Sequence, residues 1–180
     1  SVLLVGAGGL GSPAALYLAA AGVGRIGLID GDSVDLTNLQ RRLLHRTDQM
    51  GKLKTQSAQQ ALAELNPGVQ VETYPMELDG SNARGIFRQY DVILDGTDNF
   101  QARYLINDAA WLEGKPLVSA AIHQYEGQLT VFRSGETACY RCLYPDPPEP
   151  GAVPGCAEAG VLNILPGVLG TLQAAEAVKL

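Results

Sequence analysis

The sequence is short of positive charge. Its 180 residues include 13 Lys and Arg against 19 Asp and Glu, which gives a formal net charge of -6 at pH 7. Proteins that bind nucleic acids need clustered Lys and Arg side chains to neutralise phosphates. The charge balance therefore argues against a nucleic-acid partner, and the few basic side chains must serve local purposes.

Long apolar runs are also missing. No stretch approaches the roughly 20 apolar residues that span a bilayer, and no basic stretch precedes an apolar signal segment at the start. We therefore expect a cytoplasmic protein with no membrane partner. The 3 cysteines are too few for a disulfide framework, so metal binding and thiolate chemistry are the functions to consider for them.

The length and the 46% of hydrophobic residues allow one substantial core, so we expect a single domain over residues 1–180. Ser1 leads straight into an apolar run, and the apolar pattern of the final helix still continues at Leu180. We therefore expect that native segments flank this domain at both ends.

Short apolar runs alternate with amphipathic segments, a pattern typical of a parallel sheet with helices on both faces. The expected parallel strands are residues 2–5, 25–30, 69–74, 92–95 and 117–121. The expected helices are residues 10–21, 52–65, 82–87 and 100–113, with a further helical pattern near the end. Residues 128–132 alternate in polarity and predict an antiparallel strand. The fold class is therefore α/β, a Rossmann-like, doubly wound and mostly parallel sheet.

A glycine-rich turn follows the first expected strand and opens the first helix, which is the context of the dinucleotide fingerprint. Glycines allow positive φ and close approach of backbone N–H groups to phosphate, and the helix N-terminus adds partial positive charge. A tight turn without a ligand is the alternative. We assign to nucleotide binding Gly6, Gly8, Gly9 and Gly11.

Asp30 ends the second expected strand, 24 residues after Gly6, where a carboxylate can accept hydrogen bonds from ribose hydroxyls. Asp32 is a second candidate for nucleotide binding, with ordinary loop solvation as the alternative. Up to this point an NAD-dependent oxidoreductase explains the sequence equally well.

Two basic residues follow the acidic strand end, Arg41 and, thirteen residues later, Lys54. Triphosphate chemistry needs fixed cations that hold the phosphates and balance the charge on departing pyrophosphate. We assign both residues to catalysis and nucleotide binding. The alternative is that both are solvated helix charges.

An acidic segment, Asp95-Gly96-Thr97-Asp98-Asn99, follows the fourth expected strand at the same sheet edge as the glycine turn. Mg²⁺ takes one or two protein carboxylates and bridges phosphate oxygens. We assign Asp98 to catalysis and nucleotide binding, as the ligand of Mg²⁺, and Asn99 to nucleotide binding. Either residue could instead cap the following helix.

The pair Cys139 and Cys142 has the spacing of half a structural zinc site, and the other two ligands are expected outside this chain segment. A redox dithiol would open a helix, whereas prolines follow this pair from Pro145 onward. Cys156 stands alone in a proline-rich stretch that we expect to be a functional loop. Its thiolate could meet an activated acyl group, and a packed or idle thiol is the alternative.

Together these segments resemble the MoeB/ThiF family, bacterial relatives of the ubiquitin-activating enzymes. The matching segments are 6–11, 28–30, 38–41, Lys54, 94–99, 139–142, Cys156 and 158–161. The resemblance implies ATP-dependent adenylylation of the C-terminal glycine carboxylate of a ubiquitin-like sulfur carrier ending in Gly-Gly, for molybdopterin or thiamin biosynthesis. It also implies a homodimer.

By matching positions, the resemblance assigns Gly9 and Asn38 to nucleotide contacts and Asp30 to the ribose. It assigns Arg41 and Lys54 to the phosphates and Asp98 to Mg²⁺. In the thiamin branch, the cysteine matching Cys156 transfers sulfur. A second C-x-x-C pair and an upstream arginine of the family pattern are absent, which fits missing flanks.

Two other functions are considered. An NAD-dependent oxidoreductase would use the glycine turn and Asp30, but it leaves Arg41, Lys54 and Asp98 without a role. A noncatalytic adaptor would keep the nucleotide fold only as a scaffold for protein contacts.

Overall fold

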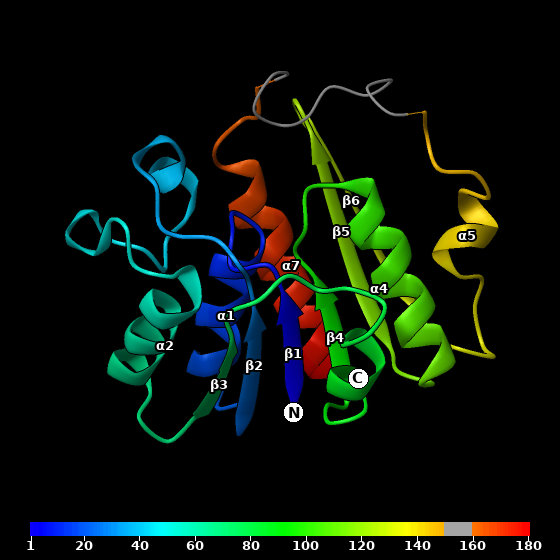
Figure 1. Ribbon diagram of the computed structural model, residues 1–180, viewed down its shortest axis with the longest axis horizontal. Coiled ribbons are helices and arrows are strands. Elements are labelled where there is room, and N and C mark those ends of the chain that lie inside the picture. The colour runs from blue at the N-terminus through cyan, green and yellow to red at the C-terminus, as the bar shows by residue number, and fades with distance from the viewer. Residues whose placement is uncertain (150–159) are drawn as a thin grey trace.

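Six strands form one sheet in the order β3-β2-β1-β4-β5-β6 in the computed structural model, which describes residues 1–149 and 160–180 (Figure 1). Strands β1 to β5 are parallel, and β6 runs antiparallel to β5. The strands are β1 (Val2–Val5), β2 (Arg25–Ile29), β3 (Gln70–Tyr74), β4 (Val92–Asp95), β5 (Leu117–His123) and β6 (Glu126–Phe132). The predicted fold class and the antiparallel strand are confirmed.

Helices alternate with the parallel strands, as predicted. They are α1 (Gly11–Ala20), α2 (Lys54–Leu65), α3 (Ala83–Phe87), α4 (Phe100–Leu112), α5 (Tyr140–Leu143) and α7 (Leu165–Lys179). Two short 3₁₀ turns, η1 (Leu36–Arg41) and η2 (Thr47–Gln49), lie between β2 and α2. The sequence predicted neither turn, because neither has enough residues for a helical apolar period.

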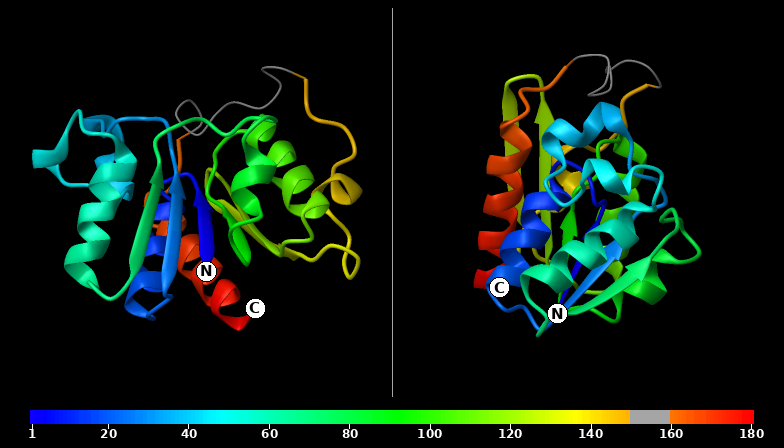
Figure 2. Two further views of the ribbon diagram at one scale, coloured as in Figure 1. Left: turned by 60° about the horizontal axis from the view of Figure 1, so that its bottom comes forward. Right: turned by 90° about the vertical axis from the view of Figure 1, so that its left-hand side faces the viewer.

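The sheet is covered on both faces (Figure 2). Alternate residues of β1 divide between two cores: Val2 and Leu4 pack with α1, α2 and α7, whereas Leu3 and Val5 pack with α3 and α4. A strand buried on both faces has no need for polar alternation, which is why β1 reads as a continuous apolar run.

Helix α7 packs closely against the start of α1. A Cβ atom at Gly170 would lie 2.3 Å from the Leu10 carbonyl oxygen, so only glycine permits this approach. The buried side chain of Gln173 donates from Nε2 to the carbonyl oxygens of Asp95 (2.7 Å) and Val118 (3.1 Å). Helix α7 thereby fixes the carboxyl end of β4.

The strand order reverses between β1 and β4, since the chain continues from β1 to β2 on one side and from β4 to β5 on the other. Ligands of open α/β sheets bind at this position, outside the carboxyl ends of the strands. The glycine turn after β1 and the acidic segment after β4 both lie there. Across the described ranges, none of the helices combines the length and apolar character that crossing a membrane requires.

Candidate nucleotide-binding site

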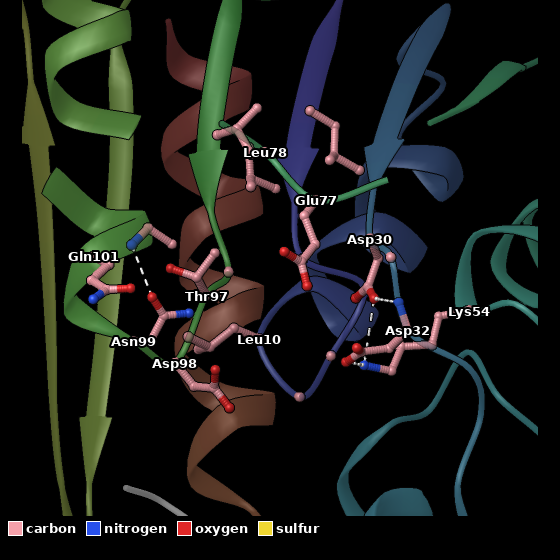
Figure 3. Close-up of a pocket in the computed structure, with 18 of the residues that line it drawn as sticks. Leu10, Asp30, Asp32, Lys54, Glu77, Leu78, Thr97, Asp98, Asn99 and Gln101 are labelled. Atoms are coloured by element: carbon pink, nitrogen blue, oxygen red, sulfur yellow. Dashed lines mark hydrogen bonds and ion pairs between the residues drawn. The ribbon is translucent and has the colours of Figure 1, made fainter. Parts of the chain in front are cut away.

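An open cavity of about 580 Å³ lies at the carboxyl edge of the sheet, within the size range of small-molecule sites (Figure 3). Segments that follow β1, β2, β3 and β4 line it, together with basic residues from the stretch between β2 and α2. The predicted site residues among its lining are Gly6, Gly8, Gly9, Asp30, Asp32, Arg41, Lys54, Asp98 and Asn99.

The glycine turn is tight on its inner side and open toward the cavity. Gly6 has a φ of +96°, and a Cβ atom at Gly11 would lie 1.9 Å from the Gly6 carbonyl oxygen. Gly11 therefore supports the turn without lining the cavity. A Cβ atom at Gly8 would meet no atom within 4 Å, which leaves space for a ligand to approach the backbone there.

The Asp30 carboxylate is hydrogen-bonded to the backbone of the glycine turn. Its Oδ2 accepts a hydrogen bond from the Ala7 N–H (2.9 Å), and its Oδ1 accepts one from the Asp32 N–H (2.9 Å). Each carboxylate oxygen can accept more than one hydrogen bond, so Asp30 retains capacity for ribose hydroxyls.

Lys54 is buried, with 3% of its surface exposed, so the alternative of a solvated helix charge is wrong for this residue. Its Nζ lies 3.5 Å from Asp30 Oδ1 and donates a hydrogen bond to Asp32 Oδ2. Figure 3 shows the three side chains gathered on the β2 side of the glycine turn. Asp32 is mostly exposed, so a bound phosphate could replace it as a partner of Lys54.

Replacing Lys54 with methionine should lower the free energy of unfolding by about 1–3 kcal/mol, because the half-buried Asp30 carboxylate loses its cation. The same loss of a charge-assisted hydrogen bond should weaken ATP binding roughly tenfold or more. Urea unfolding and calorimetric titration with ATP and Mg²⁺ measure the two effects.

The matched control is Lys52→Met, since Lys52 is exposed and only two residues away. It should match the original protein in both measurements. Equal ATP affinity in Lys54→Met and Lys52→Met would show that Lys54 does not bind phosphate.

Arg41 is half-buried and lies over the glycine turn: a Cβ atom at Gly9 would be 3.5 Å from both Arg41 Cγ and Arg41 Cδ. Arg42 also lines the cavity, and sequence reasoning missed it. Burial, and then the adjacent Arg41 charge, lower the pKa of the Arg42 guanidinium. The Arg-Arg doublet was the signal that could have identified it.

Asp98 and Asn99 take different positions at the end of β4. Asn99 is the N-cap of α4, since its Oδ1 accepts a hydrogen bond from the Ala102 N–H (2.8 Å). Asp98 is exposed and lies on the β4 side of the glycine turn (Figure 3). The two alternatives for helix capping are thus resolved in favour of Asn99.

A Mg²⁺ site fits Asp98. No group of three or more His, Cys, Asp or Glu side chains within residues 1–149 and 160–180 could hold a metal ion by itself. Mg²⁺ in nucleotide sites uses one or two carboxylates and takes its other ligands from phosphates and water. A single exposed carboxylate at the cavity is sufficient for that role.

The loop that presents Asp98 is fixed by a buried carboxylate. Asp95 accepts hydrogen bonds from the Thr97 N–H (2.9 Å) and hydroxyl (2.6 Å) and from the Ser119 hydroxyl (3.2 Å). Burial raises the pKa of Asp95. Arg103 donates to the Thr97 carbonyl oxygen (3.3 Å), so this loop is held from both sides.

The cysteine pair differs from the prediction. Cys139 is the N-cap of α5, so the pair does open a short helix; Pro145 comes only after the helix has ended at Leu143. The two Sγ atoms lie 3.6 Å apart. Two thiolates on tetrahedral zinc, each about 2.3 Å from the metal, would be roughly 3.8 Å apart, so the pair fits half a zinc site. It does not line the cavity.

The sequence analysis did not predict that the segment after β3 lines the cavity. Met76, Glu77, Leu78 and Asp79 line the cavity, and Gln101 and Leu105 of α4 complete that side. Figure 3 shows Glu77 between Asp30 and the loop after β4. The place of this segment after a parallel strand was the available signal. The side chain of Asn38 and the whole of Cys156 lie outside the described residues.

The sequence profile of the ThiF family matches residues 1–180. The chain belongs to the ThiF family. A relative from Thermus thermophilus, described as a sulfur carrier protein adenylyltransferase, is 55% identical over 184 residues, which cover 99% of this chain and 68% of the relative. The predicted family is therefore confirmed.

A second relative is adenylyltransferase and sulfurtransferase MOCS3 of Culex quinquefasciatus, which is 52% identical over 180 residues. The match covers 100% of this chain and 41% of MOCS3, so the chain spans less than half of that relative. A crystal structure of E. coli MccB with ATP matches with a TM-score of 0.82 and 23% identity over 99% of this chain and 55% of MccB. At that identity the likeness shows a shared fold.

Proposed function

We propose that this ThiF-family chain is the nucleotide-binding core of an adenylyltransferase. It would use ATP to activate the C-terminal glycine carboxylate of a ubiquitin-like sulfur carrier. The observation that carries the proposal is that the glycine turn, the buried Lys54 and the exposed Asp98 line one cavity. The name of the Thermus thermophilus relative supports the substrate class.

The reaction joins a carboxylate oxygen of the carrier to the α-phosphorus of ATP. The bond between that phosphorus and the oxygen bridging to the β-phosphate breaks, and pyrophosphate leaves with the bonding electrons. The product is an acyl-adenylate, a mixed anhydride. The attacking carboxylate is already ionised, so no general base is needed, and positioning and electrostatics supply the catalysis.

The residues divide this work by position. Amides of the glycine turn hold phosphate oxygens, Asp30 accepts from the ribose hydroxyls, and Arg41 with Lys54 balances the charge on departing pyrophosphate. Mg²⁺ bound at Asp98 would neutralise phosphate oxygens. The remaining proposed nucleotide contacts are Asp32, Asn38 and Asn99.

We also propose a protein partner, an oligomeric state and a structural metal. The partner is a carrier that ends in Gly-Gly and serves molybdopterin or thiamin biosynthesis, and the enzyme is a homodimer. Cys139 and Cys142 supply two of the ligands to a structural zinc ion. Their sulfur-to-sulfur distance supports this pairing.

The test has two stages. Calorimetric titration with ATP and with NAD, both with Mg²⁺, should show ATP binding and no NAD binding; the reverse would favour an oxidoreductase. ATP–pyrophosphate exchange is then measured with a panel of purified carriers that end in Gly-Gly. ATP binding without exchange for any carrier would favour a noncatalytic adaptor.

Cys156 is assigned to sulfur transfer alone, because its thiol could act only after the anhydride has formed. Cys156→Ala should therefore keep ATP–pyrophosphate exchange within about twofold of the original rate, as expected for a residue with no role in transition-state stabilisation of this step. Loss of exchange in this variant would place Cys156 in the adenylation step instead.

A further inference from the structure

His45 lies buried behind the glycine turn, and the proposed chemistry gives it no role. Its side chain comes from the segment between η1 and η2, and 6% of the residue is exposed. Nε2 of the ring lies 2.9 Å from the Ala7 carbonyl oxygen, and Nδ1 lies 2.9 Å from Ser57 Oγ of α2. His45 therefore connects the glycine turn to α2.

Beyond Ser57, a series of side-chain hydrogen bonds runs to Glu64, and the Glu64 carboxylate fixes which group donates and which accepts in each of them. Gln60 Nε2 donates to a Glu64 carboxylate oxygen (3.0 Å), so Gln60 turns its Oε1 toward Gln49 Nε2, which lies 3.2 Å away. Gln49 must then present its own Oε1 to Ser57, at 2.6 Å. The Ser57 hydroxyl therefore donates to Gln49, and toward His45 it can only accept.

The other end of the chain is equally fixed, because the Ala7 carbonyl oxygen can only accept. All the hydrogen bonds can form together only when both ring nitrogens of His45 carry hydrogen, which is the imidazolium form. A neutral ring has one N–H, so it gives up one bond or requires the Ser57 hydroxyl to turn away from Gln49. Protonation of His45 thus completes the pair of hydrogen bonds that connects the glycine turn to α2.

Burial of the ring and two nearby cations oppose that protonation when no ligand is bound. Burial lowers the pKa of His45, whereas the hydrogen bond to Ala7 raises it. Arg42 from its own segment and Lys54 at the start of α2 lower the pKa, and Asp30 after β2 raises it. A triphosphate in the adjoining cavity would add several negative charges, which favour the imidazolium.

We propose that His45 is a positioning residue of the glycine turn, and that its ring takes up a proton from solvent when a nucleoside triphosphate occupies the turn. The inference rests on the proposed nucleotide site. His45 is not among the residues that line the cavity, so it acts through the Ala7 carbonyl group, whose neighbours Gly6 and Gly8 face the ligand.

Two variants separate the two parts of the proposal. In His45→Gln the side-chain amide reaches about as far as Nε2 and can donate to Ala7, but it does not titrate. In His45→Ala both functions are lost. Dissociation constants for ATP with saturating Mg²⁺ are measured from pH 6 to pH 8 for both variants and the original chain. Because the phosphates of ATP also titrate in this range, each affinity is expressed as a ratio to that of His45→Gln.

Proton uptake strengthens binding at low pH, and this gain is lost as the pH rises through the pKa of the ring in the complex. The affinity ratio of the original chain to His45→Gln should therefore fall from about tenfold at pH 6 toward one at pH 8, since linkage to one proton changes affinity at most tenfold per pH unit. His45→Ala should bind about fivefold more weakly than His45→Gln at every pH, from the lost hydrogen bond.

Nitrogen NMR of the imidazole ring gives an independent readout in the unmutated protein. The chain has 2 histidines, so the signal missing from His45→Gln identifies His45. Addition of ATP and Mg²⁺ at pH 7 should move that signal toward the doubly protonated position. A ring that stays neutral under saturating ATP, or a ratio that does not change with pH, would overturn the role of His45 while the nucleotide site stands. Absence of ATP binding to the original chain would overturn both proposals.

Discussion

The Gly11→Ala variant is expected to lose at least about 3 kcal/mol of folding free energy, because overpacking against the main chain cannot be relieved by a rotamer change. The new Cβ atom would lie 1.9 Å from the Gly6 carbonyl oxygen. Gly6 is itself held between the end of β2 and the loop after β4: its N–H donates to the Ile29 carbonyl oxygen (2.8 Å), and a Cβ atom at Gly6 would lie 2.9 Å from the Gly96 carbonyl oxygen. Urea unfolding followed by the fluorescence of Trp111 measures the loss.

Gly8→Ala is the matched control in the same turn. No atom lies within 4 Å of the position its Cβ atom would take, so its free energy of unfolding should change by less than about 0.5 kcal/mol. Its methyl group would occupy the space proposed for phosphate, and ATP affinity should fall about tenfold or more. A Gly8→Ala variant with unchanged ATP affinity would show that phosphate lies elsewhere.

The Asp98→Ala variant is expected to lose ATP–pyrophosphate exchange by about 100-fold or more, the usual cost of removing one electrostatic contributor to a transition state. The side chain is exposed, so the fold should stay intact. Asp98→Asn keeps the shape of the side chain without its charge and should lose most of the activity too. Exchange with a Gly-Gly carrier and urea unfolding together measure the effect.

Asp48→Ala is the control for Asp98→Ala, since Asp48 of η2 is also an exposed carboxylate and does not line the cavity. Its exchange rate should equal that of the original chain. Retained exchange in Asp98→Ala at ordinary Mg²⁺ concentration would rule out Asp98 as the metal ligand, and an equal loss in both variants would point to a general effect of charge.

The sequence predicted the scaffold well where burial alone decides the structure. Residues 2–5 and 92–95 form strands with the predicted bounds, because each is a short, mainly apolar run buried on both faces. The glycine turn could be placed too, because it directly follows a parallel strand and so lies at the carboxyl edge of the sheet. Residues 76–79 follow β3 in the same way, so this reasoning would have placed them at the same edge.

The environment of single side chains could not be predicted, because it depends on contacts between distant segments. Spacing alone left Lys54 as either a phosphate ligand or a solvated charge, and only the approach of α2 to the Asp30 carboxylate decides that it is buried. The burial of His45 under the glycine turn has the same origin. The cysteine pair opens a helix because four residues suffice for one turn before the prolines begin.

The close packing of α7 against α1 has a consequence for synthesis of the protein. The surface of α1 near Leu10 meets its partner, Gly170, only when α7 is present. A ribosome-bound chain that ends before Leu165 therefore exposes this apolar surface, and Gln173 is not yet there to secure the end of β4. The site is thus completed only after translation has passed α7, and until then a chaperone that binds apolar segments can compete for α1.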